Sequence, residues 1–219
     1  MEVWVNEMVR ALFLYGVNCT EKVWDKLLPL LSSWECEVLA YPHEVTQRAN
    51  CMDDLTKWVA SQIKEKEYDV IIGHSLGGLI ALELAAQYEI PTRTKIICLD
   101  TNLKPAGPFF RNLMTSEHME IFGEEVGEMM TKERVYYTEA MFKSLQEEFD
   151  YTYLLMEIKN PVELLLGDRN DADAKRHISE LHLSEEVLKK LRIKFVPNSC
   201  HMAMIESPEK LWEILCEKH

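Results

Sequence analysis

Short runs of Val, Ile and Leu alternate along the chain with longer amphipathic segments. This alternation is typical of a parallel sheet whose strands are joined by covering helices. The runs predict strands at Val9–Tyr15, Glu37–Ala40, Asp69–Ile72, Lys95–Leu99, Val162–Leu166 and Arg192–Val196. We therefore expect an α/β fold with a mostly parallel sheet of about six to seven strands flanked by helices.

Apolar positions at helical spacing predict two crossover helices between the first three strands. The first contains Trp24, Leu27, Leu28 and Leu31, and the second contains Leu55, Trp58, Val59 and Ile63. Ser207 and Pro208 predict the start of a final helix through Leu211 and Leu215, because serine is a common cap and proline suits the first helical turn.

The stretch 107–159, between the fourth and fifth predicted strands, carries helix-like pieces and no strand signal. We expect a helical lid here, inserted into a core of residues 1–106 and 160–219, the whole forming a single domain. Its soft apolar side chains suit the roof of a pocket over an apolar substrate group, although each could equally attach the insertion to the core. They are Phe109, Phe110, Leu113, Met114, Met119, Phe122, Met129, Met130, Met141, Phe142 and Met156.

Composition narrows the classes of partner. Of the 219 residues 47% are hydrophobic and 28% charged, and no apolar run approaches the roughly 20 residues that span a bilayer. The formal charge of −13, from 24 basic and 37 acidic residues, opposes binding to nucleic acid or to anionic membranes. Residues Met1–Glu7 carry acids where a secretory signal carries Lys or Arg, so we expect a cytoplasmic protein. The six cysteines form no C-x-x-C pair, which indicates reduced thiols and no zinc site.

The most informative motif is Gly73-His74-Ser75-Leu76-Gly77-Gly78, which follows an apolar run and opens a helix-like run. Small residues two positions before and after Ser75 let the chain bend sharply and expose the hydroxyl, as in a nucleophile elbow. The free N–H groups at the start of the next helix favour negative charge beside it. The alternative is an ordinary turn whose serine caps the helix. We predict Ser75 as a nucleophile, and we do not expect its neighbour His74 to be the base.

A serine nucleophile requires a base, and His201 lies in a suitable loop between the last predicted strand and the final helix. The order Ser75 then His201 is that of nucleophile-elbow enzymes. The alternative is a hydrogen-bonded structural histidine. The backbone N–H groups of Val17 and Leu76 are the predicted oxyanion donors. The histidines that we expect at the surface are His43, His118, His177, His182 and His219.

These motifs resemble those of the α/β-hydrolases over nearly the whole chain. Leu14-Tyr15-Gly16 resembles the family's His-Gly loop with Tyr in place of His, Gly73–Gly78 its elbow, and His201–Glu209 its His-x-x-x-x-Glu-x-Pro-Glu ending. Leu99–Asn102 resembles the exit from the family's sixth strand, so the lid is inserted after that strand. The resemblance implies hydrolysis through an acyl-serine intermediate.

The sequence matches the family less well at the acidic residue that orients the catalytic histidine. The family's Asp usually stands three residues after the glycine that ends its seventh strand, but Asn170 occupies that position here. An amide cannot stabilise the imidazolium that forms during catalysis. We predict Asp171 as the acid, because a loop longer by one residue could aim it at His201. Asp168, which suits a turn, and Asp100, which follows the fourth predicted strand, are the alternatives.

We therefore expect a serine hydrolase that cleaves a small ester, thioester or amide with an apolar portion, using Ser75, His201 and Asp171, with Val17 and Leu76 at the oxyanion. No cofactor and no metal are expected, because the chain supplies the reacting groups. The expected partner is a small-molecule substrate, not nucleic acid or a membrane, and the oligomeric state stays open. The imperfect acid motif also allows a hydrolase-like protein that binds a small apolar ligand under the lid without turnover.

Overall fold

Six parallel strands in the order β2-β1-β3-β4-β5-β6 form the sheet of the computed structural model, which describes residues 8–146 and 149–217. The strands are β1 (Arg10–Leu14), β2 (Glu35–Val38), β3 (Val70–His74), β4 (Lys95–Leu99), β5 (Val162–Gly167) and β6 (Leu191–Val196). Every neighbouring pair is parallel, which confirms the predicted α/β class. Strands β3 and β5 are buried along their whole length, as expected for a sheet covered on both faces.

Strand β2 differs most from its prediction, since it begins at Glu35 instead of Glu37. It lies at the edge of the sheet, where Arg10 pairs with Glu35 and Phe13 with Val38. The apolar residues that suggested the later start lie at the end of this half-buried strand and beyond it. The bounds of β2 follow from its pairing with β1, and they cannot be predicted from a local hydrophobic run.

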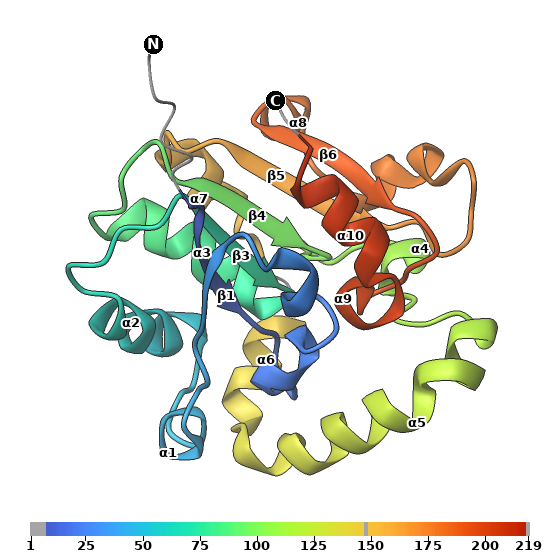
Figure 1. The fold of residues 1–219 in the computed structure, drawn as a ribbon, viewed down its shortest axis with the longest axis horizontal. Helices are drawn as coiled ribbons and strands as arrows, with labels where there is room; N and C mark the ends of the chain where they lie inside the picture. Colours follow the sequence, from blue (N-terminus) through green and yellow to red (C-terminus); the bar gives the residue numbers. More distant parts are fainter. Residues whose placement is uncertain (1–7, 147–148, 218–219) are drawn as a thin grey trace.

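Helices cover the two faces of the sheet (Figure 1). On one face α3 (Leu76–Gln87) packs on β1, β3 and β4, and α2 (Met52–Gln62) and α7 (Thr152–Glu157) pack on α3. On the other face α10 (Pro208–Leu215) packs on β6, next to α9 (Ala203–Glu206) and the 3-10 turns η1 (Glu21–Trp24) and η2 (Leu28–Leu31). Shorter elements are α1 (His43–Thr46), η4 (Ala174–Leu181) and α8 (Glu185–Leu188).

The first predicted crossover helix is wrong as an α-helix, because this stretch forms only the 3-10 turns η1 and η2. Pro29, which has no backbone N–H, lies within η2 and opposes a continuous helix. The apolar spacing still identified the core, since Trp24 and Leu27 are fully buried. The second predicted helix is confirmed as α2, and the last begins at Pro208, although Ser207 makes no side-chain capping bond.

Within the described residues, the regular elements of the insertion 107–159 are all helices or 3-10 turns. It contains α4 (Pro108–Arg111), α5 (Ser116–Glu133), η3 (Arg134–Tyr136) and α6 (Glu139–Gln146), and ends with α7. Figure 1 shows α5 and α6 beside the end of the sheet at which the strand arrows point. Ligands of open α/β sheets bind at that end, so the insertion is positioned to contribute to a site.

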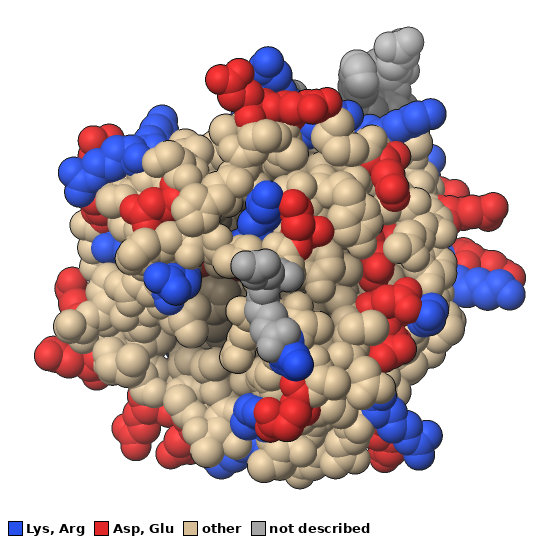
Figure 2. Space-filling model, turned by 180° about the vertical axis from the view of Figure 1, so that it is seen from behind, with Lys and Arg blue, Asp and Glu red and all other residues tan. Residues whose placement is uncertain are grey.

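No helix within residues 8–146 and 149–217 has the length and apolar character that a bilayer crossing requires. The expectation drawn from Met1–Glu7 lies outside the described residues. Figure 2 shows acidic and basic side chains interspersed over the face behind that of Figure 1, with no continuous patch of either sign.

A methyl group at Gly73 is expected to destabilise the protein. The Cβ of an alanine there would overlap the backbone of Gly77 and Gly78, where the first turn of α3 crosses the end of β3. Since backbone atoms cannot yield as a side chain does, we expect Gly73→Ala to lower the free energy of unfolding by about 1–3 kcal/mol, or more. Urea denaturation followed by circular dichroism measures this change.

Gly127 provides the matched control, because it lies inside α5 and a Cβ there would meet nothing within 4 Å. Gly127→Ala should leave stability unchanged or raise it by about 0.5–1 kcal/mol, since alanine favours a helix interior. Equal denaturation midpoints for Gly73→Ala and the parent protein would contradict the close strand–helix approach.

Candidate active site

Ser75 stands at the turn between β3 and α3 with φ 53° and ψ −119°. This left-handed backbone is unusual for a residue other than glycine, and it turns the side chain away from the helix axis. The turn is held by Ser75 N–H donating to Leu99 O at 2.9 Å and by Thr101 Oγ1 donating to Ser75 O at 3.0 Å. Although Ser75 is the N-cap of α3, its side chain makes no capping hydrogen bond, so the capping alternative is wrong.

His201 lies in the loop between β6 and α9, and its ring contacts a buried carboxylate. Its Nδ1 is 3.0 Å from Asp100 Oδ1, across 101 positions of sequence. Its backbone N–H donates to Leu113 O at 3.2 Å, and its carbonyl is 3.0 Å from His74 Nε2. Because Nδ1 faces Asp100, Nε2 is the ring nitrogen left for a proton transfer.

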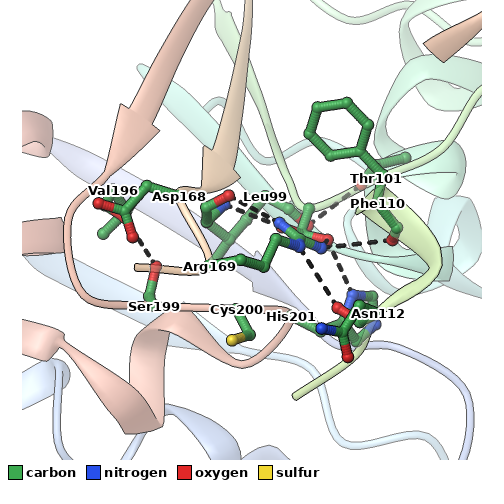
Figure 3. Close-up of polar contacts among 12 residues, drawn as sticks. Leu99, Thr101, Phe110, Asn112, Asp168, Arg169, Val196, Ser199, Cys200 and His201 are labelled. Atoms are coloured by element: carbon green, nitrogen blue, oxygen red, sulfur yellow. Dashed lines mark hydrogen bonds and ion pairs between the residues drawn. The ribbon is translucent and has the colours of Figure 1, made fainter. Parts of the chain in front are cut away.

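Asp100 and Arg169 form a buried pair beneath this histidine. Asp100 directly follows β4, is 1% exposed, and accepts both Nη1 and Nη2 of Arg169 at 2.8 Å. Asp100 Oδ2 also accepts the Gly167 N–H at 2.9 Å. Figure 3 shows the Arg169 guanidinium at the centre of these contacts, with further bonds to the carbonyls of Phe110 and Asn112. With Gly167 O as well, all five guanidinium N–H groups have acceptors.

The positive charge of Arg169 favours the ionised form of the Asp100 carboxyl. Burial alone would raise the pKa of Asp100, but the positive charge of Arg169 and hydrogen bonds from His201 and Arg169 hold it well below its usual value. Asp100 is therefore an anion at neutral pH. An ionised carboxylate on Nδ1 orients the imidazole and stabilises its protonated form.

The expectation that Asp171 contacts His201 is wrong. Asp171 Oδ2 is 2.6 Å from Arg176 Nη2 and 3.3 Å from His177 Nε2, at the half-buried rim of the loop. The loop after β5 is directed instead by Arg169, whose side chain turns inward to Asp100. Asp168 has the turn-forming role that its position suggested, since its Oδ1 accepts the Asn170 N–H at 2.9 Å.

His74 contributes in a way that its sequence position did not reveal. It is buried, with its ring centroid 4.6 Å from that of His201. Burial first, and the neighbouring His201 second, lower the pKa of His74 to about 3, so its ring is neutral. A neutral ring that donates from Nε2 to His201 O fixes the backbone of the loop. His74 is thus a positioning residue, consistent with the expectation that it is not the base.

Among the other histidines, His43 and His182 are exposed as expected, His177 is half-buried, and His219 lies outside the described residues. His118 is the exception, because it is only 5% exposed. Its place in the first turn of α5, which packs against α9, buries the ring. The surface assignment of His118 is therefore wrong.

Ser75 and His201 line one cavity of about 280 Å³, together with Val17 and Asp100. The insertion contributes most of the apolar wall, and the residues that it supplies are Leu113, Met130, Phe142, Leu145, Gln146 and Phe149. Of the apolar side chains predicted to roof a pocket, only Leu113, Met130 and Phe142 line this one; Phe110 and Met141 are core residues. A larger hollow of about 640 Å³ near the end of α2 contains neither Ser75 nor His201.

Val17 lines the same cavity as Ser75, and Leu76 follows Ser75 in the chain. Leu76 is the first residue of α3, so its N–H has no acceptor within the helix. Val17 lies in the turn after β1, where Cys19 N–H donates to Gly16 O at 3.3 Å. The Cβ of an alanine at position 16 would lie 2.9 Å from Ser75 Cβ, so this turn passes close to the serine. Tyr15 packs away from it, since its hydroxyl accepts the Tyr41 N–H at 2.6 Å.

Comparison with known proteins gives one partial sequence match, and no family model matches the chain. Over 90 residues the chain is 31% identical to a Haemophilus influenzae protein provisionally named 2-succinyl-6-hydroxy-2,4-cyclohexadiene-1-carboxylate synthase. The match spans 38% of this chain and 36% of that protein, which is about a third of the relative's length.

Solved structures match over nearly the whole chain. Est816, described as an N-acyl homoserine lactone degrading enzyme, has a TM-score of 0.68 at 16% identity over 95% of this chain and 92% of its own. The thioesterase domain from the curacin biosynthetic pathway gives 0.64 at 15% identity, covering 95% and 91%. MenH from S. aureus gives 0.64 at 14% identity, covering 98% and 94%. These likenesses establish the architecture: the chain has the α/β-hydrolase fold.

Proposed function

We propose that this protein is a serine hydrolase that cleaves a small ester, thioester or amide through an acyl-serine intermediate. The observation that carries the proposal is the 3.0 Å contact between His201 Nδ1 and the buried Asp100 carboxylate, at a cavity that Ser75 also lines. A base held in one tautomer by an anion, next to a serine on a strained turn, is the arrangement that activates a hydroxyl.

The reaction begins when Ser75 Oγ attacks the substrate carbonyl carbon and its proton passes to His201 Nε2. The carbonyl oxygen becomes an anion that the N–H groups of Val17 and Leu76 stabilise. Collapse breaks the bond to the leaving group, which takes the proton from His201 and leaves the acyl group on Ser75. A water molecule then gives a proton to His201 and attacks the acyl carbon. The bond from that carbon to Ser75 Oγ breaks, Ser75 takes the proton back from His201, and the carboxylic acid leaves.

Among the described residues the Ser75 side chain donates no hydrogen bond, so its hydroxyl is not committed to another acceptor. Contacts between nucleophile and base are often long before substrate binds and tighten in the reacting complex. Asp100 holds His201 through Nδ1, which leaves Nε2 free for the serine proton.

The cavity favours a substrate with an apolar portion of modest size. Leu113, Met130, Phe142 and Leu145 form its walls, and about 280 Å³ lies at the small end of the range for ligand sites. We therefore infer that residues 107–159 act as a lid that selects the acyl or leaving group. The formal charge of −13 opposes binding to phosphate backbones and favours a small molecule over nucleic acid as the partner.

A fluorophosphonate probe tests the nucleophile directly, because it reacts with serines activated by a base. We expect one adduct on the native protein, which peptide mapping assigns to the peptide that contains Ser75. Ser61, whose hydroxyl donates to Trp58 O, is the matched control residue and should stay unlabelled. Heat-denatured protein should take up no label, since the His201–Asp100 pair then no longer exists.

The ligand-binding alternative makes a different prediction for nitrophenyl esters of short and medium chain length. A hydrolase releases nitrophenol, whereas a binding protein shows a ligand-induced thermal shift without release. Native protein that neither takes the probe at Ser75 nor cleaves any ester, beside an active control enzyme, would refute the hydrolase proposal.

A further inference from the structure

A second cluster of chemically active side chains lies behind the His201 loop. His118 from the first turn of α5, Cys200 from the loop after β6 and Glu206 from α9 point at one another. His118 Nδ1 is 3.6 Å from Cys200 Sγ and 3.6 Å from Glu206 Oε1. All three ligand atoms lie within 4.8 Å of one another. These residues take no part in the reaction proposed above.

The two separations from His118 Nδ1 fit a tetrahedral metal ion, and the third ligand pair lies within 4.8 Å. Zinc bonds of about 2.3 Å to sulfur and 2.0–2.2 Å to nitrogen or oxygen put neighbouring ligand atoms roughly 3.3–3.6 Å apart. The two distances from His118 Nδ1 are at the upper end of that range. Three protein ligands of this kind leave a fourth position for water or another small ligand.

Glu206 supplies an independent sign of a missing partner. Its side chain is 0% exposed, and Oε1 accepts no hydrogen bond among the described residues. Its other oxygen, Oε2, accepts the Cys200 N–H, so the carboxylate is anchored with Oε1 aimed into the cluster. His118 Nδ1 lies 3.6 Å from Oε1, which is longer than a hydrogen bond, and a cation between the two atoms would satisfy both.

Thr115 contacts both the sulfur of Cys200 and the backbone of His118. The Thr115 N–H donates to Cys200 Sγ at 3.4 Å, and Thr115 Oγ1 caps α5 by accepting the His118 N–H at 3.4 Å. One residue therefore fixes both ligands.

We propose that His118, Cys200 and Glu206 bind a divalent transition metal ion, with zinc as the first candidate, and that the ion fastens α5 to the loop that carries His201. Thiolate, imidazole and carboxylate form a mixed donor set typical of zinc. A thiolate and a carboxylate balance the two charges of the ion, so the buried site would be neutral overall. This proposal differs from the expectation of no metal, because the ligands come from two stretches of the chain, with His118 and Cys200 82 positions apart.

The second nitrogen of His118 fits this role after one rearrangement. Asn170 Nδ2 lies 3.4 Å from His118 Nε2 and 3.1 Å from Glu117 Oε2. With the metal on Nδ1, Nε2 carries the proton, and rotation of the Asn170 amide presents its oxygen to it. Ligating histidines commonly have such a partner. The rotation breaks only the bond to Glu117, an exposed side chain that can turn into solvent.

Cobalt(II) is the probe, because a thiolate ligand gives it a charge-transfer absorption band in the near ultraviolet. We expect the reduced full-length protein to bind one Co²⁺ with this band and with the intense visible bands of tetrahedral geometry, and Zn²⁺ to displace it. Cys200→Ser should abolish the charge-transfer band. His118→Asn should weaken Co²⁺ binding by about a hundredfold or more, since loss of even an outer-shell partner costs about 10–100-fold.

Cys51 provides the matched control, since it lies near Asp53 and Asp54 in a half-exposed group whose acids suit solvent. Cys51→Ser should keep the band at full strength. Wild-type protein that shows no thiolate band at saturating Co²⁺ would overturn the proposal, as would a Cys200→Ser variant that keeps it. Both readouts are independent of esterase activity, and far-UV circular dichroism verifies that each variant is folded.

Discussion

Replacing Ser75 by alanine should lower kcat for ester hydrolysis by about a millionfold, the size of loss seen when the nucleophile of such a site is removed. In the proposed reaction Ser75 supplies the attacking oxygen. Because the Ser75 side chain makes no hydrogen bond with the residues that the structure describes, its removal should leave the denaturation midpoint unchanged. Steady-state kinetics on the best nitrophenyl ester and urea denaturation measure the two effects.

Ser61→Ala serves as the control for this variant, since it removes an exposed hydroxyl on α2 and should retain full activity. Near-normal turnover by Ser75→Ala would show that another group carries the reaction. Lost activity together with lost stability would point instead to misfolding of the elbow, which the denaturation curve detects.

Changing Asp100 to asparagine should lower kcat by about ten-thousandfold, as the same change does in serine proteases. The amide would still fit beside His201, but it cannot stabilise the imidazolium and it favours the wrong tautomer. It would also leave Arg169 buried opposite a neutral group, so some loss of stability should accompany the loss of turnover. Kinetics at a temperature well below the midpoint separate the two effects.

Asp171→Asn is the matched comparison, because the same chemical change is made at the rim of the loop. We expect activity within a few-fold of the parent protein, since Asp171 contacts Arg176 and His177 and not His201. A large loss at Asp171 with little effect at Asp100 would reverse the assignment of the acid.

The strands and the elbow could be predicted because their signals are local. A buried strand is a run of apolar residues, and the bend at Ser75 requires small neighbours within two positions of it. His201 followed from chain order and its place before the last helix. Pro29 is a local signal against a continuous α-helix, but the helical spacing of its apolar neighbours outweighed it in the prediction.

The acid could not be chosen in the same way. Asp100 and His201 are 101 positions apart, and their contact depends on β4 and the β6 loop ending at the same edge of the sheet. Arg169 is the residue that decides between Asp100 and the acids of its own loop, by turning into the protein to pair with Asp100. No spacing rule reports that an arginine will be buried. The same holds for His118, which only the packing of α5 on α9 brings to Cys200.

The residues proposed to react and most residues of the apolar wall come from different parts of the chain, and this separation bears on how selectivity can change. Ser75, Asp100 and His201 stand at the ends of elements that belong to the sheet, whereas one continuous stretch, residues 107–159, supplies most of the apolar wall. Substitutions at wall side chains such as Met130 and Phe142 can therefore alter which compounds enter, while the backbone carbonyls of Phe110, Asn112 and Leu113 continue to hold Arg169 and His201. Changing those wall side chains offers a direct route to new selectivity on an otherwise unchanged site.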